Sequence, residues 1–291
     1  MRQSFLFTVG LVWLVGFTLL GQAVPPPAAK LVVLGHAGSG FFTPINPFNF
    51  RPPSSWRGVQ HALDLGADGV EIDLQLSQDS VVMLYHDPTL ENMSTGAGCI
   101  SQHPAAELTQ LRYRGGWPYD WLQRERPITF DTLLARLSRR PAFPRLHLDL
   151  HEDDPCLAPG QPRRTPALLR QIAVALRRYR VAVANVLLVT QDASTVRQAR
   201  SFLPGVAVGL EIASDEFAAG LRLAQAEKAH AVVLNAARVT PAQTAQARAA
   251  GMAVAVFGGR SGKSIKRILA ARPDEIEADN VKRLLILQGR R

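Results

Sequence analysis

Beyond residue 20, the 291-residue sequence has no apolar run long enough to cross a bilayer, so we expect no membrane-spanning helix there. It has no nucleic-acid-binding motif, and a formal charge of +9 at pH 7 does not by itself indicate such a partner. No internal repeat divides the chain, and we expect one domain. Only two cysteines are present, Cys99 and Cys156. In an oxidising compartment we expect them to form a disulfide, with two free thiols as the alternative.

The single long apolar run, residues 5–20, follows Arg2 and is followed by the small residues of Gly21-Gln22-Ala23. This order of charged, apolar and small residues is typical of a secretory signal. We therefore expect residues 1–23 to be a cleaved signal peptide, with an uncleaved anchor as the alternative, and residues 24–30 to be a linker. The protein would then be exported, to the periplasm or outside the cell. No cysteine lies near the cut, so we do not expect a lipoprotein.

Strand-like and helix-like stretches alternate from residue 31 to the end. We predict strands at residues 31–35, 69–76, 145–150, 185–190, 206–211, 231–235, 252–257 and 275–278. Residues 81–85 form another apolar run, but a four-residue turn separates it from the second strand, which is too short for a parallel crossover. This run must fold back as a hairpin. The remaining eight strands, each followed by a helical pattern, predict a (β/α)8 TIM barrel over residues 31–291, with an excursion at about 77–128 between strand two and helix two.

Acidic residues lie where the barrel mouth is expected. Glu71 and Asp73 stand two apart on the second strand, so both carboxylates point to the same face. The third strand alternates strictly and puts His147, Asp149 and His151 on one face. Because barrel active sites lie at the C-terminal ends of strands, we expect the three carboxylates to bind one divalent cation, Ca²⁺ or Mg²⁺.

Two alternatives to that cation site remain. The carboxylates could be exposed strand-end charges bridged to arginines. A zinc site could use His147, His151 and a carboxylate, although His147 is also compatible with a hydrogen-bonded core histidine.

Two further histidines are candidates for proton transfer. His36 ends the first strand, and His86 ends the returning run of the hairpin. The hairpin brings His86 back beside the carboxylates of strand two, and histidine titrates near physiological pH. A metal with two proton carriers at one mouth predicts catalysis.

Taken together, these stretches resemble the glycerophosphodiester phosphodiesterases across nearly the whole mature chain. The matching segments are residues 34–38 (LGHAG), 67–77 (ADGVEIDLQLS), 85–90 (YHDPTL), 127–133 (PITFDTL) and 148–151 (LDLH). The resemblance implies hydrolysis of glycerophosphodiesters to an alcohol and glycerol phosphate. It also implies that His36 and His86 are the acid–base pair, and that Glu71, Asp73 and Asp149 bind the metal.

The sequence departs from the family at its phosphate contacts. The family's His-Arg-Gly is His-Ala-Gly here, with Ala37 in place of the phosphate-binding arginine, and its strand-three lysine is His151. The family's Pro-Glu-Asn-Thr stretch is replaced by residues 42–53. We expect substrate contacts from the following five residues: Asn46, Asn49, Arg51, His151 and Glu211. Arg51 and Lys263 are the candidates to replace the missing cation.

Two other functions stay open. The related sphingomyelinase D-like phospholipases also lack the arginine, and Phe41, Phe42, Phe48 and Phe50 near the mouth would suit lipid head groups. A lysophospholipid substrate and transient contact with a membrane surface are therefore compatible with the sequence. A non-catalytic binding barrel is suggested by the lost arginine, but both histidines are present. Residues 258–264 end like a P-loop, yet Phe257 stands where that motif requires glycine, so no nucleotide site is predicted.

Overall fold

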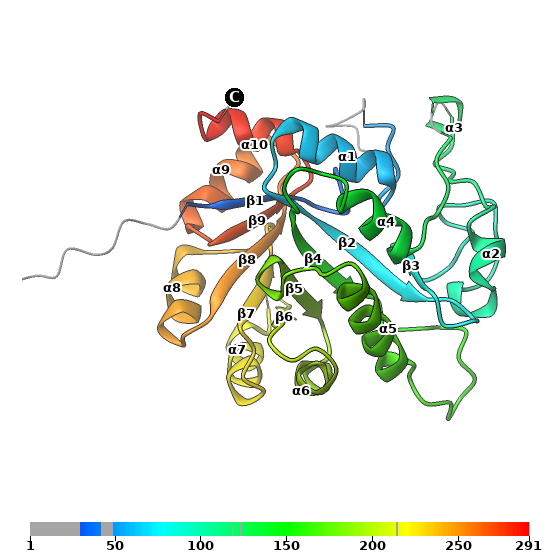
Figure 1. The fold of residues 1–291 in the computed structure, drawn as a ribbon. Helices are drawn as coiled ribbons and strands as arrows, with labels where there is room; N and C mark the ends of the chain where they lie inside the picture. Colours follow the sequence, from blue (N-terminus) through cyan, green and yellow to red (C-terminus); the bar gives the residue numbers. More distant parts are fainter. Residues whose placement is uncertain (1–29, 42–48, 118, 123, 214, 291) are drawn as a thin grey trace, which may run out of the picture. The chain divides into compact units, whose positions relative to one another are not determined.

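The computed structural model describes residues 30–41, 49–117, 119–122, 124–213 and 215–290. One compact unit spans Leu31–Arg291. Within its described residues, eight parallel strands run in the order β1-β9-β8-β7-β6-β5-β4-β2, and pairing between β1 and β2 closes the barrel. The strands are β1 (Val32–Gly35), β2 (Gly69–Leu76), β4 (Arg145–Leu150), β5 (Val186–Thr190), β6 (Ala207–Ile212), β7 (Ala231–Asn235), β8 (Ala253–Gly258) and β9 (Glu275–Ala278). The predicted (β/α)8 fold is confirmed (Figure 1).

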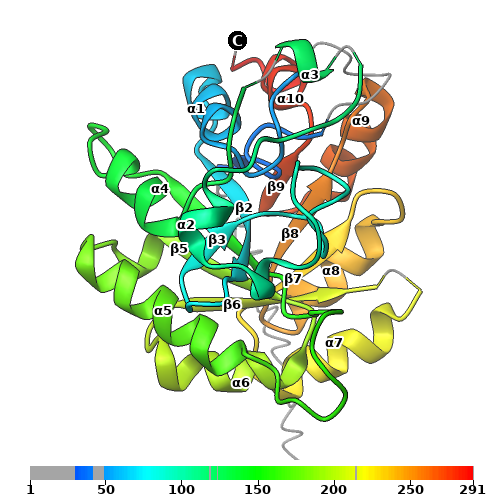
Figure 2. The same cartoon turned by 90° about the vertical axis from the view of Figure 1, so that its right-hand side faces the viewer.

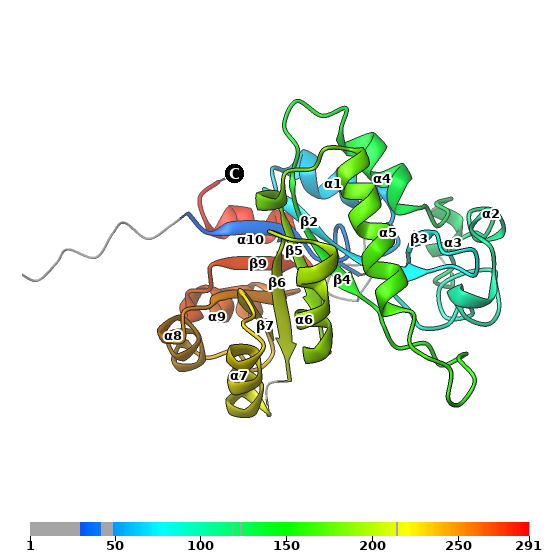
Figure 3. The same cartoon turned by 60° about the horizontal axis from the view of Figure 1, so that its bottom comes forward.

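Helices cover the outside of the barrel, as Figures 1 and 3 show. They are α1 (Trp56–Leu65), α4 (Phe130–Leu137), α5 (Thr165–Arg178), α6 (Ala193–Phe202), α7 (Phe217–Ala226), α8 (Pro241–Ala249), α9 (Gly262–Ala271) and α10 (Val281–Leu287). Local signals set their ends. In α1, for example, the Ser55 side chain accepts a hydrogen bond from the Gly58 amide, and Gly66 ends the helix at φ 99°. None of the helices among the described residues combines the length and apolarity needed to span a membrane.

Alternate side chains of each barrel strand pack in two places, against the outer helices or inside the barrel. One set of alternate side chains, such as Val70, Ile72 and Leu74 of β2, packs against the helices in the main core. The other set points into the barrel. Its residues on β5, β7 and β8 form a small apolar cluster: Leu187, Val189, Ala231, Val233 and Ala255. On β2, β4 and β9 the inward positions carry buried polar side chains instead: Glu71, Asp73, Gln75, His147, Glu275 and Glu277.

The excursion between β2 and α4 has its own short elements and its own core. Strand β3 (Val82–Leu84) pairs antiparallel with β2, which confirms the predicted hairpin (Figure 2). Three short helices follow, η1 (Ile100–Gln102), α2 (Ala105–Leu108) and α3 (Tyr119–Leu122), and none of them was predicted. A disulfide between Cys99 and Cys156, as expected, ties the excursion to the loop after β4, with the two Cα atoms 6.0 Å apart.

Candidate active site

A cavity of about 170 Å³ opens at the C-terminal ends of the strands. Among the described residues, seven of the ten predicted site residues line it: His36, Glu71, Asp73, His86, Asp149, His151 and Glu211. They arrive from β2, β4 and β6 and from the turns that follow β1, β3 and β4. The strand register explains the convergence, because Asp73 of β2 is paired with Asp149 of β4 in the parallel ladder.

Three carboxylates meet in this cavity. Oxygen atoms of Glu71, Asp73 and Asp149 lie within 4.8 Å of one another. Oε2 of Glu71 accepts a hydrogen bond of 2.6 Å from the Ala37 amide, whereas its Oε1 is buried and has no hydrogen-bond partner among the described residues. Burial and the neighbouring carboxylates raise the pKa of Glu71 well above its usual value. A bound divalent cation would satisfy the orphaned oxygen and relieve the repulsion, so the donor set fits Ca²⁺ or Mg²⁺.

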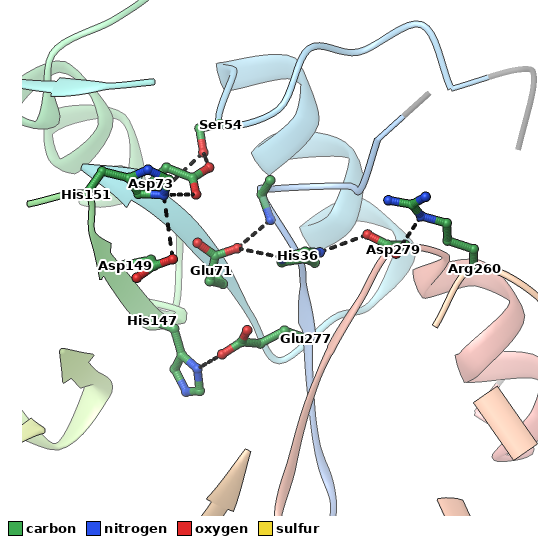
Figure 4. A network of polar contacts seen from close by, with 11 residues as sticks. His36, Ser54, Glu71, Asp73, His147, Asp149, His151, Arg260, Glu277 and Asp279 are labelled. Atoms are coloured by element: carbon green, nitrogen blue, oxygen red, sulfur yellow. Dashed lines mark hydrogen bonds and ion pairs between the residues drawn. The ribbon is translucent and has the colours of Figure 1, made fainter. Parts of the chain in front are cut away.

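His151 lies against two of these carboxylates. Its Nε2 is 3.0 Å from Oδ1 of Asp73 and 3.6 Å from Oδ2 of Asp149 (Figure 4). Burial lowers the pKa of His151, but the two carboxylates outweigh burial and raise it well above 6.5. Asp73 also accepts a hydrogen bond of 2.6 Å from the hydroxyl of Ser54. His151 thus adds positive charge at the carboxylate cluster itself. The sequence showed only that His151 stands where the family has lysine, not that it contacts the carboxylates.

His36 is held by a carboxylate from the opposite end of the chain. Its Nδ1 is 2.8 Å from Oδ1 of Asp279, and Oδ2 of Asp279 accepts a hydrogen bond of 3.0 Å from Nε of Arg260 (Figure 4). Nε2 of His36 lies 3.9 Å from Glu71. Burial alone would lower the pKa of His36, but the hydrogen bond and charge of Asp279 raise it to about 9. His36 is therefore oriented and kept protonated near neutral pH.

His86 has a similar arrangement on the other side of the cavity. Its Nδ1 lies 2.7 Å from Oδ1 of Asp87, the next residue. The ring of Phe41 lies between the two histidines, with its centroid 5.4 Å from that of His36 and 4.9 Å from that of His86. Each histidine is thus held at Nδ1 by a carboxylate, which fixes the ring and leaves Nε2 for proton transfer.

His147 is a core histidine and not a metal ligand at the mouth, so the zinc alternative is wrong. It is fully buried, with Nδ1 2.5 Å from Glu277 and Nε2 2.7 Å from Glu275. Both ring nitrogens are therefore engaged. Burial lowers its pKa, but these two carboxylates prevail and raise it to about 9.

Of the other predicted substrate contacts, only one lines the cavity. Glu211 lines the cavity, and burial and Asp149 raise its pKa to about 7. Asn49 is buried, and its amide donates to the carbonyl oxygens of Ser39 and Gly40 at 3.1 and 2.8 Å. It therefore holds the loop after β1, and it is not among the described residues that line the cavity. Arg51 is not among the described residues that line the cavity, and Asn46 lies outside the described residues.

Sequence reasoning missed Asp279, Arg260 and Glu277. Asp279 directly follows the last strand, so the rule that barrel sites lie at strand ends could have found it. Glu277 lines the cavity from inside β9, two residues earlier. Arg260 lies in the glycine-rich turn between β8 and α9, whereas the sequence pointed to Lys263, in the first turn of α9.

Comparison with known proteins identifies the family. The model of the glycerophosphoryl diester phosphodiesterase family matches residues 50–283. The chain belongs to this family. Among curated proteins, it is 41% identical over 71 residues to a probable glycerophosphodiester phosphodiesterase 1 of Mycobacterium tuberculosis, covering 24% of this chain and 26% of that protein. It is 29% identical over 82 residues to a glycerophosphodiester phosphodiesterase of Caldanaerobacter subterraneus, covering 28% of this chain and 30% of that one. These alignments span about a quarter to a third of each relative.

Solved structures share the fold over most of the chain. A phosphodiesterase of Oleispira antarctica, in complex with the product sn-glycerol-3-phosphate, aligns with a TM-score of 0.73 at 20% identity, covering 89% of this chain and 96% of that one. A putative glycerophosphoryl diester phosphodiesterase of Silicibacter pomeroyi aligns with a TM-score of 0.73 at 18% identity, covering 89% and 94%. At these identities the likeness supports the barrel fold.

Proposed function

We propose that the protein is a metal-dependent phosphodiesterase that hydrolyses glycerophosphodiesters to an alcohol and glycerol phosphate. One observation carries the proposal: a single cavity holds two carboxylate-paired histidines, His36 and His86, beside a cluster of three carboxylates. A barrel that only binds ligand would gain little from two oriented imidazoles. Hydrolysis of a phosphodiester needs one group to remove a proton from the nucleophile and another to protonate the leaving oxygen.

Glu71, Asp73 and Asp149 would hold one Ca²⁺ or Mg²⁺ ion. When bound, such an ion neutralises charge on the phosphoryl oxygens of the substrate. The orphaned Oε1 of Glu71 supports this assignment, because a buried carboxylate oxygen without a partner is costly to keep.

The two histidines are proposed to have distinct roles. His36, kept protonated by Asp279, would donate a proton from Nε2 to the leaving alcohol oxygen. His86, oriented by Asp87, would accept the proton of the nucleophile, either water or a neighbouring hydroxyl of the substrate. The sequence alone left this assignment open.

Arg260 is our candidate to replace the family arginine lost at Ala37. Its guanidinium lies 6.0 Å from the centroid of Phe41, which contacts both histidines. Among the described residues, only its Nε makes a side-chain hydrogen bond, to Asp279, so both Nη atoms could bind a phosphate oxygen. A cavity of about 420 Å³, lined by Arg260 together with His36 and Arg267, adjoins the mouth and could take one arm of the diester.

Purified protein should release glycerol phosphate from glycerophosphocholine, lose this activity in chelator, and regain it with Ca²⁺ or Mg²⁺. A phospholipase D-like enzyme would instead cleave lysophosphatidylcholine and leave glycerophosphocholine intact. A binding barrel would retain either compound unchanged. Full turnover in metal-free buffer would contradict the cation site.

We also propose that the protein is exported. The disulfide supports this proposal, because disulfides persist in oxidising compartments. N-terminal sequencing of protein recovered from the medium or periplasm should begin near residue 24. Recovery of the intact N-terminus from the membrane fraction would favour an anchor instead.

A further inference from the structure

Two tryptophans in the excursion stand out by their exposure. Trp117 is 82% exposed and Trp121 is 78% exposed, and Leu122 beside them is 54% exposed. Trp121 and Leu122 belong to α3, which Figures 1 and 2 draw at the outer edge of the excursion, apart from the barrel strands. Large adjacent apolar side chains left in water commonly mark a binding surface.

The segment that carries these tryptophans is held at its N-terminal side by backbone hydrogen bonds to residues 93–95, and internally by one side-chain bond. The Arg112 carbonyl accepts a hydrogen bond from the Thr95 amide at 2.9 Å, and the Arg114 amide donates to the Met93 carbonyl at 2.6 Å. The Gly115 amide donates to Oδ1 of Asp120 at 2.8 Å. Tyr113, by contrast, is buried and stacks on Tyr85. The chain therefore buries its neighbouring tyrosines in a small core while it directs Trp117 and Trp121 outward.

Basic residues flank the exposed tryptophans in the sequence. Residues 112–126 contain four arginines, all exposed, and two acidic residues, which gives the segment a net charge of +2 (four minus two). The arginines are Arg112, Arg114, Arg124 and Arg126. A hollow of about 610 Å³ is lined by three of them together with Trp121 and one carboxylate, Asp120, whose Oδ1 is already bonded to the Gly115 amide. It is large enough to admit an anionic head group beside the indole.

We propose that this Trp–Arg patch, formed by Trp117, Trp121 and those four arginines, docks on the surface of an anionic phospholipid bilayer. Indole rings favour the boundary between water and lipid, because one edge is polar and the body is apolar. Arginine side chains bind lipid phosphates and are attracted by the negative surface potential of such a bilayer. Exposed indoles with a basic rim match both the interfacial zone and the negative charge of such a bilayer, so we take anionic lipid as the partner.

Docking there would have a functional consequence that rests on the proposed activity. The patch belongs to the same excursion as His86, which extends from the C-terminal end of β2, at the mouth of the barrel. Contact with a bilayer would bring that mouth near lipid-borne diesters. The substrate class would then include lysophospholipids held in the membrane, besides diesters in solution.

Vesicle sedimentation tests the patch separately from catalysis. The purified mature protein should bind vesicles of phosphatidylcholine mixed with phosphatidylglycerol, bind phosphatidylcholine alone weakly, and dissociate at high salt. The double variant Trp117→Ser/Trp121→Ser should reduce the bound fraction at least about tenfold, because interfacial binding scales with the apolar area inserted. Its rate on glycerophosphocholine in solution should stay unchanged, since neither tryptophan lines the catalytic cavity.

Matched controls are available elsewhere on the surface. Val183 and Ile286 are exposed by 47% and 43%, and Val183→Ser/Ile286→Ser should not alter vesicle binding. Wild-type protein that fails to bind anionic vesicles, or a tryptophan variant that binds them as well as wild type, would overturn the inference. A wild-type dimer in light scattering that the tryptophan variant converts to monomer, without vesicle binding, would identify the patch as a self-association surface. In each of these cases activity on glycerophosphocholine still decides the proposed function independently.

Discussion

Replacing Glu71 by glutamine should stabilise the metal-free protein while it destroys activity. Glu71 is 2% exposed, its Oε2 accepts from the Ala37 amide, and its Oε1 has no hydrogen-bond partner among the described residues. Glutamine keeps the volume and can still accept from Ala37. Its amide nitrogen would take the place of Oε1 and present a donor to the surrounding carboxylates. The substitution therefore removes a buried charge and an unsatisfied acceptor together.

The size of the effect depends on pH in a defined direction. The folded state raises the pKa of Glu71 above its usual value of 4.5. Below pH 4.5 the carboxyl is protonated in both the folded and the unfolded states, so it imposes no penalty. As the pH rises from there, the free energy of unfolding of the wild type should fall by up to about 1.4 kcal/mol per pH unit, until the folded-state pKa is reached. Glutamine does not titrate, so the free energy of unfolding of the variant does not fall with pH at this position.

Thermal melts in chelator between pH 5 and pH 8 measure the difference. Glu71→Gln should have a higher Tm than the wild type. The difference in Tm should grow with pH, by about 2–4 °C for each kcal/mol of unfolding free energy that the wild type loses. Added Ca²⁺ or Mg²⁺ should raise the wild-type Tm, by the equivalent of about 2.7 kcal/mol at a hundredfold excess over Kd, and should not raise that of the variant. Glu216→Gln, at an exposed position, should show neither effect. A variant that melts below the wild type at pH 8, or a gap that narrows as pH rises, would refute the reasoning.

Four further variants test the rest of the site and the disulfide. His36→Ala and His86→Ala should each lower kcat by roughly 10²–10⁴-fold in steady-state assays, the usual contribution of a general acid or base. Arg260→Gln should raise KM for glycerophosphocholine about tenfold with a smaller effect on Tm, because it removes a charge-assisted contact to phosphate. Cys99→Ser/Cys156→Ser should lower the free energy of unfolding by up to about 4 kcal/mol in urea titrations, since the bridge closes a loop of 57 residues.

Each of these has a matched control. His103 also pairs with a carboxylate, Glu107, but lies outside the cavity, so His103→Ala should leave kcat unchanged. Lys263→Gln removes a cation next to the same turn without touching the cavity that Arg260 lines. If the Lys263 and Arg260 variants have equal kcat and KM, Arg260 does not bind the substrate phosphate. A reducing agent that lowers wild-type stability but not that of the double serine variant would support the role of the bridge.

The sequence by itself determined the elements and the direction of the key carboxylates. Side chains alternate along a strand with a period of two, so Glu71 and Asp73 had to share a face. A four-residue turn is too short for a parallel crossover, so the run after it had to form a hairpin. Every predicted barrel strand lies within about one residue of its place in the structure, because buried strands bounded by turns are local features. The short helices of the excursion were missed, because they lack a long apolar period.

Tertiary structure alone decided which groups complete the site. Asp279 reaches His36 across 243 residues because β9, the last strand, pairs with β1, the first, and that pairing depends on the whole chain. Across the barrel interior, Glu277 of β9 meets His147 of β4, so a histidine that could have bound metal is held in the core. The sequence also does not determine the exposure of Trp117, because an aromatic side chain in a loop is buried only if neighbouring segments pack over it. Contacts of this kind have no local signal, because they arise only when distant segments are packed together.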